Sequence, residues 1–489
     1  METYLDGLWF ARLVFQRGLS AIYLLAFASA LNQFRPLLGE HGLLPTPQLL
    51  QRSSFRQAPS LFHLHYSDRL FTALAWLGIA LSCLALLGLS ESGPLWLSFT
   101  VWLTLWLLYL SIVNVGQVFY GFGWESMLLE AGFFACFLGP SQLTPSFIPL
   151  LCLRWMLFRV ELGAGLIKLR HDSCWRDLTC LYYHYETQPI PNPLSCHFHR
   201  LPKPLHRFSV GFSHFVQLVV PFGLFLPQPC ALVAAGLMAG HQLLLIISGN
   251  YAWLNWLTIV LGASALSDAA VHDMLGLVAP QTVARSTAHE LLLYALLGLT
   301  LCLSIAPLRN LFAKRQLMNH SYNALHLVNA YGAFGSVSRE RYEVVLEGST
   351  DTPFGDDADA AWRAYEFKAK PGDPRRRPRQ CAPYHLRLDW LMWFLPFAVS
   401  VSEGGIFVLQ RERWFVELVR RLLEGERATL ALLQENPFPN APPRLIRARF
   451  YRYRYADAAE RKAGAYWART LLGEYLPPVS LQTLPRHSS

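Results

Sequence analysis

Long apolar runs separated by short polar turns fill the first 306 residues of the chain. A helix needs roughly 20 apolar residues to cross the hydrocarbon of a bilayer. Leu70–Ser90 and Leu95–Val115 meet that length and are joined by the turn ESGP. The pattern predicts a polytopic α-helical membrane bundle of roughly seven to nine segments. The runs are Gly18–Gln33, Leu70–Ser90, Leu95–Val115, Ser126–Leu138, Phe147–Leu169, Phe208–Leu226, Cys230–Ser248, Tyr251–Leu266 and His289–Ala306.

Two short runs and two long polar loops interrupt this simple pattern. The runs near residues 126 and 251 are short, so we expect them to be re-entrant or buried within the bundle. The polar loops cover residues 34–69 and 170–207. If every run crosses, both loops and the C-terminal region lie on one side, opposite the N-terminus. The Lys and Arg residues of the loops would make that side cytoplasmic by the positive-inside rule.

The composition changes after Ala306. Residues 1–306 carry 15 Lys and Arg against 14 Asp and Glu, whereas residues 307–489 carry 27 against 19. We therefore divide the rest of the chain into a basic linker at 307–318, a soluble domain of mixed α/β type at 319–481, and a short end at 482–489. The bundle anchors this C-terminal domain, which is called the tail below.

Alternating and helical patterns predict the elements of the tail. Its arginines at 447 and 449 change phase to 452 and 454, which indicates a β-bulge. The elements expected are strands at Arg341–Gly348, Ala361–Lys370 and Arg444–Tyr455, a loop at Pro371–Gln380, and an amphipathic helix at Glu412–Glu424.

The overall composition supports a membrane protein. Hydrophobic residues make up 53% of the 489 residues, charged residues only 15%, and the mean hydropathy is +0.25. Soluble domains have about 25% charged residues, so the composition excludes a disordered chain and an ordinary cytosolic enzyme. The lipid bilayer is thus one partner. The basic run PRRRPR at 374–379 is interpreted as a solvated surface, and no nucleic-acid partner is predicted.

Charged residues inside one apolar run are the strongest candidates for function. Arg154, Arg159, Glu161 and Lys168 lie in or at the end of the run Phe147–Leu169. Charges at membrane depth usually face a partner or a cavity. Because Arg154, Glu161 and Lys168 are spaced seven residues apart, they share one helix face and can neutralise one another along it.

Three interpretations of this cluster stay open. The favoured one is a salt-bridge network that locks the bundle, to which Glu125 and Glu130 of another helix would add carboxylates. The second is an active site in which Lys168 is a desolvated base and Glu161 its neighbour. The third is a polar binding cavity. No catalytic residue is assigned beyond the weak candidates Lys168 and Glu161.

The loop at 170–207 carries the remaining candidates. His184 and Glu186 suggest metal or acid–base chemistry, but the prolines that follow predict a stiff extended loop with ordinary hydrogen bonds. A disulfide among Cys174, Cys180 and Cys196 would form only if the loop faces an oxidising compartment. No spacing of a metal site and no cofactor motif occurs, so no metal and no cofactor are predicted.

Several collinear motifs carry a family resemblance. The longest are AFASALNQFRPLLGEHGLLP, VGQVFYGFGWESMLLEAGFFACFLGP and LRWMLFRVELGAGLIKLRHDSCWRDLTCLYYHYETQPIPNPLS, with NAYGAFGSVSRERYEVVLEGS and PRLIRARFYRYRY in the tail. Over nearly its full length the chain resembles the lipase maturation factor family. The motif HLRLDWLMWF differs from the usual family pattern by Leu386 and Leu391, which replace polar residues.

The resemblance implies a multi-pass protein of the endoplasmic reticulum membrane that assists folding and assembly of secreted lipases. It places the tail in the lumen, against the positive-inside rule. For a bacterial member the membrane would be the plasma membrane. A second, fainter similarity links GAGLIKLRHDSCW, with Lys168 and Trp175, to vitamin K-dependent gamma-carboxylase-type bundles, and it implies that Lys168 occupies the place of a catalytic base. The favoured hypothesis is a folding factor, and the alternative is a membrane enzyme.

Overall fold

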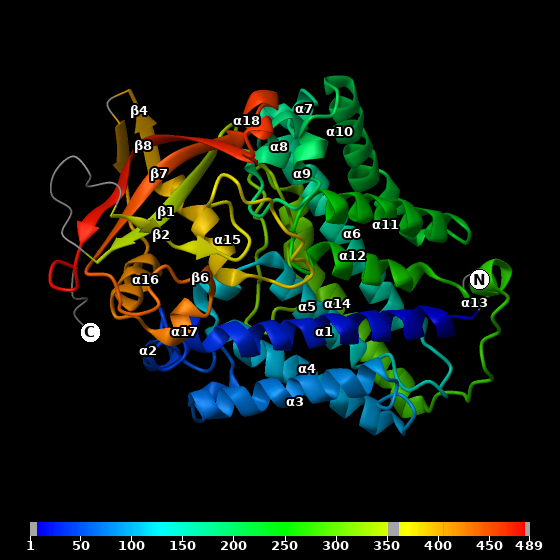
Figure 1. The fold of residues 1–489 in the computed structure, drawn as a ribbon. Helices are drawn as coiled ribbons and strands as arrows, with labels where there is room; N and C mark the ends of the chain where they lie inside the picture. Colours follow the sequence, from blue (N-terminus) through cyan, green and yellow to red (C-terminus); the bar gives the residue numbers. More distant parts are fainter. Residues whose placement is uncertain (1–6, 351–360, 404, 485–489) are drawn as a thin grey trace.

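The computed structural model describes residues 7–350, 361–403 and 405–484. Among these residues, six helices are long and apolar enough to cross a membrane. Figure 1 shows them gathered in one bundle, with the tail packed against one end. The six are α1 (Trp9–Leu38), α3 (Asp68–Leu86), α4 (Leu95–Val115), α10 (Lys203–Leu218, extended to Phe225), α11 (Cys230–Ser248) and α14 (Thr287–Phe312).

Three further segments complete the bundle. The pair α12 (Leu254–Gly262, extended to Ala265) and α13 (Asp268–Leu275) bends by 101° and counts as a seventh span if taken as one. Helices α5 (Gly123–Ala135) and α6 (Phe147–Arg170) lie inside. Most residues of both are buried, including every charged one except Arg170, and α6 contacts α5, α10, α12 and α14. The buried charges of α5 and α6 therefore lie among other segments of the protein.

The two long polar loops fold into short helices. The first contains α2 (Thr46–Arg52), and the second contains α7 (Ser173–Arg176), α8 (Leu181–Thr187) and α9 (Ser195–His199). The prediction that His184 and Glu186 lie in an extended loop was wrong, because both belong to α8. The extended backbone begins only at Gln188, where the first proline follows and disfavours helix.

Both loops contact the tail. Arg200 Nη2 donates to the Ala456 carbonyl at 2.7 Å, and Arg413 Nη2 donates to Gln48 Oε1 at 2.6 Å. Trp9, at the start of α1, instead donates its backbone N–H to Asp268 of α13. The loops and the tail thus lie at one end of the bundle, and α1 begins at the other (Figure 1).

A four-stranded antiparallel sheet in the order β2–β1–β7–β8 forms the centre of the tail. The strands predicted at β1 (Arg341–Ser349) and β7 (Leu445–Tyr455) are confirmed. The bulge is confirmed too, because the pairing of β7 with β8 (Trp467–Val479) shifts between Phe450 and Tyr451, where the arginines change phase. Both faces of β1 are covered, so its alternation does not mark an exposed side.

The strand predicted at Ala361–Lys370 was wrong as one element. It splits into β2 (Arg363–Ala364), which pairs with β1, and β3 (Glu366–Phe367), which pairs with β6 (Leu433–Glu435). After β3, Asp389 Oδ1 accepts the backbone N–H groups of Ala369 and Lys370, at 2.6 and 3.0 Å, so these two donors bind a side chain and not a neighbouring strand.

The remaining tail elements surround the sheet. The amphipathic helix is confirmed as α16 (Arg413–Leu423), whose apolar face is buried. The predicted loop at Pro371–Gln380 contains neither helix nor strand. The other elements are α15 (Arg387–Phe394), the hairpin β4 (Val399–Ser402) and β5 (Gly405–Val408), α17 (Arg427–Leu430) and α18 (Ala458–Lys462).

The predicted linker is partly helical. Helix α14 continues through Pro307 to Phe312. The Asn310 side chain then bonds both backbone groups of Leu317, and Gln316 Nε2 donates to the Gly163 carbonyl of α6 at 3.0 Å. The linker therefore packs on the bundle. Of the predicted short end 482–489, residues 485–489 lie outside the described residues.

Candidate functional site at the junction of bundle and tail

A buried ion pair joins Glu130 of α5 to Arg159 of α6. The tail completes this pair. Asn329 donates its backbone N–H and its side-chain amide to Glu130 Oε2, at 2.9 and 3.0 Å, and Tyr331 OH donates to the same oxygen at 2.8 Å. Arg159 Nη1 donates to the Asn329 carbonyl at 2.5 Å. The pair therefore binds a tail residue inside the bundle through its backbone and its side-chain amide.

A second buried pair joins Glu125 of α5 to Arg387 of α15. Arg387 Nη1 lies 2.6 Å from Glu125 Oε1, and both side chains are 0% exposed. The same nitrogen donates to the Phe119 carbonyl at 2.8 Å, and Tyr109 OH of α4 donates to Glu125. The guanidinium carbon lies 3.4 Å from the centre of the Tyr120 ring. In this cation–π contact the Tyr120 ring lies against the guanidinium of Arg387, whose Nε and Nη2 have no hydrogen bond to described residues.

The residues before Arg387 are fixed to α1. Gln33 Nε2 donates to the His385 carbonyl at 2.6 Å, and Gln33 Oε1 accepts the backbone N–H of Arg387 at 2.9 Å. The His385 ring lies against Trp124 and Trp253. Burial and the neighbouring Arg387 lower the pKa of His385 to about 4, which keeps the ring neutral at physiological pH.

Lys168 and Glu161 belong to a chain of buried amides. Lys168 Nζ donates to Gln217 Oε1 of α10 at 2.7 Å, and Gln217 Nε2 donates to Glu161 Oε2 at 3.2 Å. Gln242 Nε2 of α11 donates to Glu161 Oε1 at 2.7 Å, and Asn255 Nδ2 of α12 donates to Gln242 Oε1 at 2.6 Å. One polar chain thus links four helices. Gln217 bridges the two charges that the sequence placed on one face.

Arg154 does not continue the predicted charge stripe toward Glu161. It donates to the backbone carbonyls of Ser264 and Leu224, at 3.0 and 3.2 Å, near the end of the bundle away from the tail. Both carbonyls lie in short 3-10 helices, Val220–Phe225 and Ala263–Ala265, where backbone oxygens near the end lack intrahelical donors. The seven-residue spacing fixed the face of α6, but Arg154 contacts backbone carbonyls, whereas Glu161 and Lys168 share Gln217.

The loop candidates contact both the tail and the bundle. Trp175 Nε1 donates to the Phe334 carbonyl at 2.9 Å, and its ring lies under Lys168 Nζ at 4.8 Å. His184 Nε2 is bonded to Tyr251 OH at 2.9 Å, and burial lowers the pKa of His184 to about 3. Glu186 Oε1 accepts the backbone N–H of Tyr455 on β7 at 2.7 Å. None of these contacts resembles a metal site.

A polar cluster on β1 was missed by the sequence reasoning. Arg341 is bonded to Glu343, and Lys370 Nζ lies 2.9 Å from Glu343 Oε2. Arg341 also donates to the carbonyls of Gln188 and Pro189, at 2.5 and 3.1 Å, in the loop that follows α8. The alternating pattern predicted a strand here but gave no partner for these charges. The sequence did contain a signal for Arg387, because this residue is a charge within the apolar motif LRLDWLMWF.

The cysteines of the loop are now assigned. Cys174 and Cys180 form a disulfide, and Cys196 is free and buried. Among described residues, one group has the spacing of metal ligands, Asp172 with Cys174 and Cys180, but both sulfurs are committed to the disulfide. Although burial opposes it, hydrogen bonds from Arg339 and from the N–H groups of Cys174 and Val337 lower the pKa of Asp172 to about 2. Asp172 is therefore a fixed anion that caps α7.

Known proteins match both parts that meet at this junction. The family model "Lipase maturation factor transmembrane domain" matches residues 10–273, and "Lipase maturation factor C-terminal domain" matches residues 327–477. The chain belongs to the lipase maturation factor family. Its family membership and its apolar helices make it a multi-pass membrane protein.

Curated members of the family match along nearly the whole chain. The chain is 43% identical to lipase maturation factor 1 of Bos taurus, over 97% of this chain and 90% of that protein. It is 40% identical to lipase maturation factor 1 of Homo sapiens, over 97% and 89%. It is 30% identical to lipase maturation factor 2 of Gallus gallus, over 96% and 81%. No solved structure matches the chain. The comparisons give no support to the gamma-carboxylase alternative.

Proposed function

We propose that this protein is a maturation factor of the endoplasmic reticulum membrane that assists the folding and assembly of secreted lipases. The observation that carries the proposal is the match to proteins named for lipase maturation, which spans the bundle and the tail together. In this proposal residues 1–306 anchor the protein, residues 307–318 connect, and residues 319–481 meet the client.

The junction supports a tail held in one orientation. Two buried carboxylates of α5, Glu125 and Glu130, each bind a residue of the tail, Arg387 and Asn329 respectively. Breaking a buried ion pair by losing one partner costs about 3 to 5 kcal/mol. The tail is therefore fixed to the bundle and presents the same surface to every client, whereas a tethered domain would tumble freely.

The disulfide supports a lumenal tail. Cys174–Cys180 lies in the loop at 170–207, which contacts the tail through Arg200 and Glu186. Disulfides persist in oxidising compartments and are rare in the cytosol. The charge of the tail itself does not oppose this side, because large folded domains translocate regardless of their charge. The Lys and Arg of the loops at 34–69 and 170–207 favour the opposite side, and we give the disulfide more weight because it requires an oxidising compartment.

The contacts of Lys168 favour a structural role over general-base catalysis. A catalytic base needs access to a substrate proton. Lys168 is 6% exposed, and its ammonium binds the Gln217 amide and lies over the Trp175 ring. The polar chain from Lys168 to Asn255 links four helices. The side-chain donors and acceptors along it are hydrogen-bonded to one another.

Co-expression tests the proposal. The protein is produced with a secreted homodimeric lipase in cells that lack their own maturation factor, and the specific activity and dimer fraction of the secreted lipase are measured. We expect both to rise. Unchanged lipase activity, with the protein present in the membrane at normal level, overturns the proposal. Deleting residues 319–489 is a poor control because it leaves Glu125 and Glu130 buried without their tail partners.

A further inference from the structure

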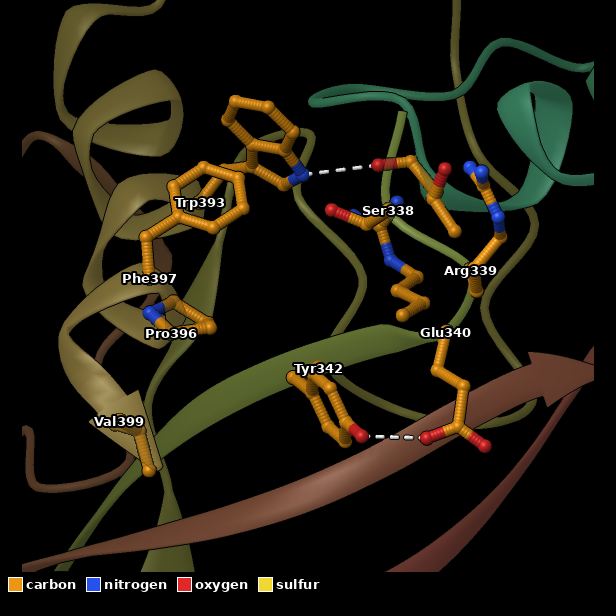
Figure 2. A pocket seen from close by; sticks show the side chains of 10 residues that line it. Ser338, Arg339, Glu340, Tyr342, Trp393, Pro396, Phe397 and Val399 are labelled. Carbon is orange, nitrogen blue, oxygen red and sulfur yellow. Dashed lines mark hydrogen bonds between the residues drawn. The ribbon is translucent and has the colours of Figure 1, made fainter. Parts of the chain in front are cut away.

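A cavity of about 470 Å³ lies where strand β1 begins. Figure 2 shows its two walls facing each other. One wall is the backbone and side chains of residues 338–342, and the other comes from the end of α15 and the start of β4. Trp393 Nε1 donates to the Thr187 carbonyl at 3.0 Å and closes one end. We call this cavity the β1-edge pocket; its lining includes Ser338, Glu340, Tyr342, Trp393, Pro396, Phe397 and Val399.

The first wall of the pocket is an open strand edge. Backbone groups of alternate strand residues point to the same side. The Leu346 carbonyl accepts the N–H of Tyr365, and the Val344 carbonyl accepts Lys370 Nζ, both on the side away from β7. The N–H and C=O of Tyr342 therefore point to that side as well. Strand β2 pairs only with Glu347 and Gly348, so among the described residues the beginning of β1 has no neighbouring strand on that side.

The second wall supplies apolar surface. Phe397 is 56% exposed and contacts Trp393 edge-on, with ring centres 4.8 Å apart. Phe394 beside them is 42% exposed. Exposed aromatic rings of this kind bury large apolar area when a partner covers them. The volume lies within the range of ordinary ligand pockets and suits a large apolar side chain.

The charges at the rim are already paired. Arg339 Nη2 lies 2.7 Å from Asp172, and Arg452 Nη1 lies 3.1 Å from Glu340, which also accepts the Tyr342 hydroxyl. The rim therefore offers no unpaired charge to an ionic ligand. An occupant is recognised by backbone hydrogen bonds and apolar contact.

We propose that the β1-edge pocket binds an extended, uncharged segment of an unfolded secreted polypeptide by strand addition, with one large apolar side chain against Trp393 and Phe397. This deepens the proposed function and rests on it. Strand addition reads the backbone and tolerates many sequences, so one pocket serves unrelated segments. Once the client folds, its own strands form the backbone hydrogen bonds of that segment, and the segment leaves the pocket.

A peptide-binding experiment tests the pocket directly. The probe is a capped, fluorescein-labelled nine-residue peptide in which threonine and valine alternate around a central phenylalanine. Fluorescence anisotropy measures its binding to the full-length protein in lipid nanodiscs. A second peptide carries N-methyl groups on the alternate amides that face one edge of the extended peptide. A third peptide carries them on the amides that face the opposite edge. Each peptide therefore lacks the N–H donors of its methylated edge and keeps those of the other edge. We expect one methylated edge to weaken binding at least about tenfold.

Two matched variants locate the binding. Phe397→Asp changes an exposed ring of the pocket, and Phe407→Asp changes a ring that is 68% exposed on β5, outside the pocket lining. We expect Phe397→Asp to weaken binding about tenfold and Phe407→Asp to change it less than about twofold. A benzophenone in place of the central phenylalanine should crosslink to residues 338–342 or 393–399. Absent binding, equal binding of all three peptides, or equal loss in both variants overturns the proposal.

The lipase co-expression assay separates this inference from the proposed function. If unaltered protein raises lipase activity and Phe397→Asp raises it equally, the pocket inference fails while the maturation function stands. If unaltered protein does not raise lipase activity, the function fails whatever the peptide does.

Discussion

Replacing Arg387 with Leu should loosen the tail from the bundle. The change removes the ion pair with Glu125, the bond to the Phe119 carbonyl and the contact with the Tyr120 ring. The Glu125 carboxylate would stay 0% exposed, with the Tyr109 hydroxyl and the His385 ring nitrogen, 3.6 Å from Glu125 Oε1, beside it but no cation of the tail to balance its charge. Loss of one partner of a buried pair costs about 3 to 5 kcal/mol.

The assay is thermal unfolding in nanodiscs, followed by intrinsic fluorescence, together with limited proteolysis of the junction. We expect Arg387→Leu to lower the midpoint by about 5 °C or more and to speed cleavage. Glu125→Gln should cost a similar amount, since it leaves the guanidinium buried. The double variant Arg387→Leu/Glu125→Gln should cost less than the sum by at least about 2 kcal/mol, because both buried charges are gone.

Arg413→Leu is the matched control. Arg413 also joins the tail to the bundle side, through Gln48, but it is exposed. Exposed polar contacts contribute about 0 to 1 kcal/mol, so its midpoint should shift by about 1 °C at most. Equal midpoints for Arg387→Leu and Arg413→Leu, or strict additivity in the double variant, would refute the reasoning that buried charge holds the junction.

Three other changes have distinct expected outcomes. Cys174→Ala/Cys180→Ala should cost about 2 kcal/mol, from the loop entropy of a separation of 6 residues, seen as a lower midpoint; an unchanged midpoint contradicts it. Lys168→Arg should preserve lipase maturation at equal protein level, and loss of maturation would support the base hypothesis. The pKa of His385 is about 4 when folded and about 6.5 when unfolded, so stability should fall as pH drops through that window, by up to about 1.4 kcal/mol per unit. His385→Gln should reduce this slope, measured by unfolding at pH 7 and pH 5.

Local pattern was sufficient for much of the architecture. Apolar length located the spans, and the phase of Arg447, Arg449 and Arg452 located the bulge in β7. Helical period gave α16. Each of these signals arises from the order of residues within one element, so a short window of sequence contains it.

Contacts between distant segments could not be predicted in the same way. Spacing put Glu161 and Lys168 on one face of α6, but the bridging amide is Gln217 of α10. Glu125 was expected to join the α6 charges, yet its partner Arg387 lies 262 positions away in the tail. Periodicity reports which face of an element is buried and does not report what buries it. The residues of the β1-edge pocket were missed for that reason, because the pocket exists only where β1 and α15 meet.

The side of the membrane on which the tail lies is the most direct test of the account. An epitope at the C-terminus, in sealed microsomes treated with protease, reports that side in one experiment. The account predicts a tag that is protected until detergent opens the vesicles, because the tail must meet secretory clients in the lumen. A tag digested in intact microsomes contradicts it, since a cytoplasmic tail never contacts a secreted lipase.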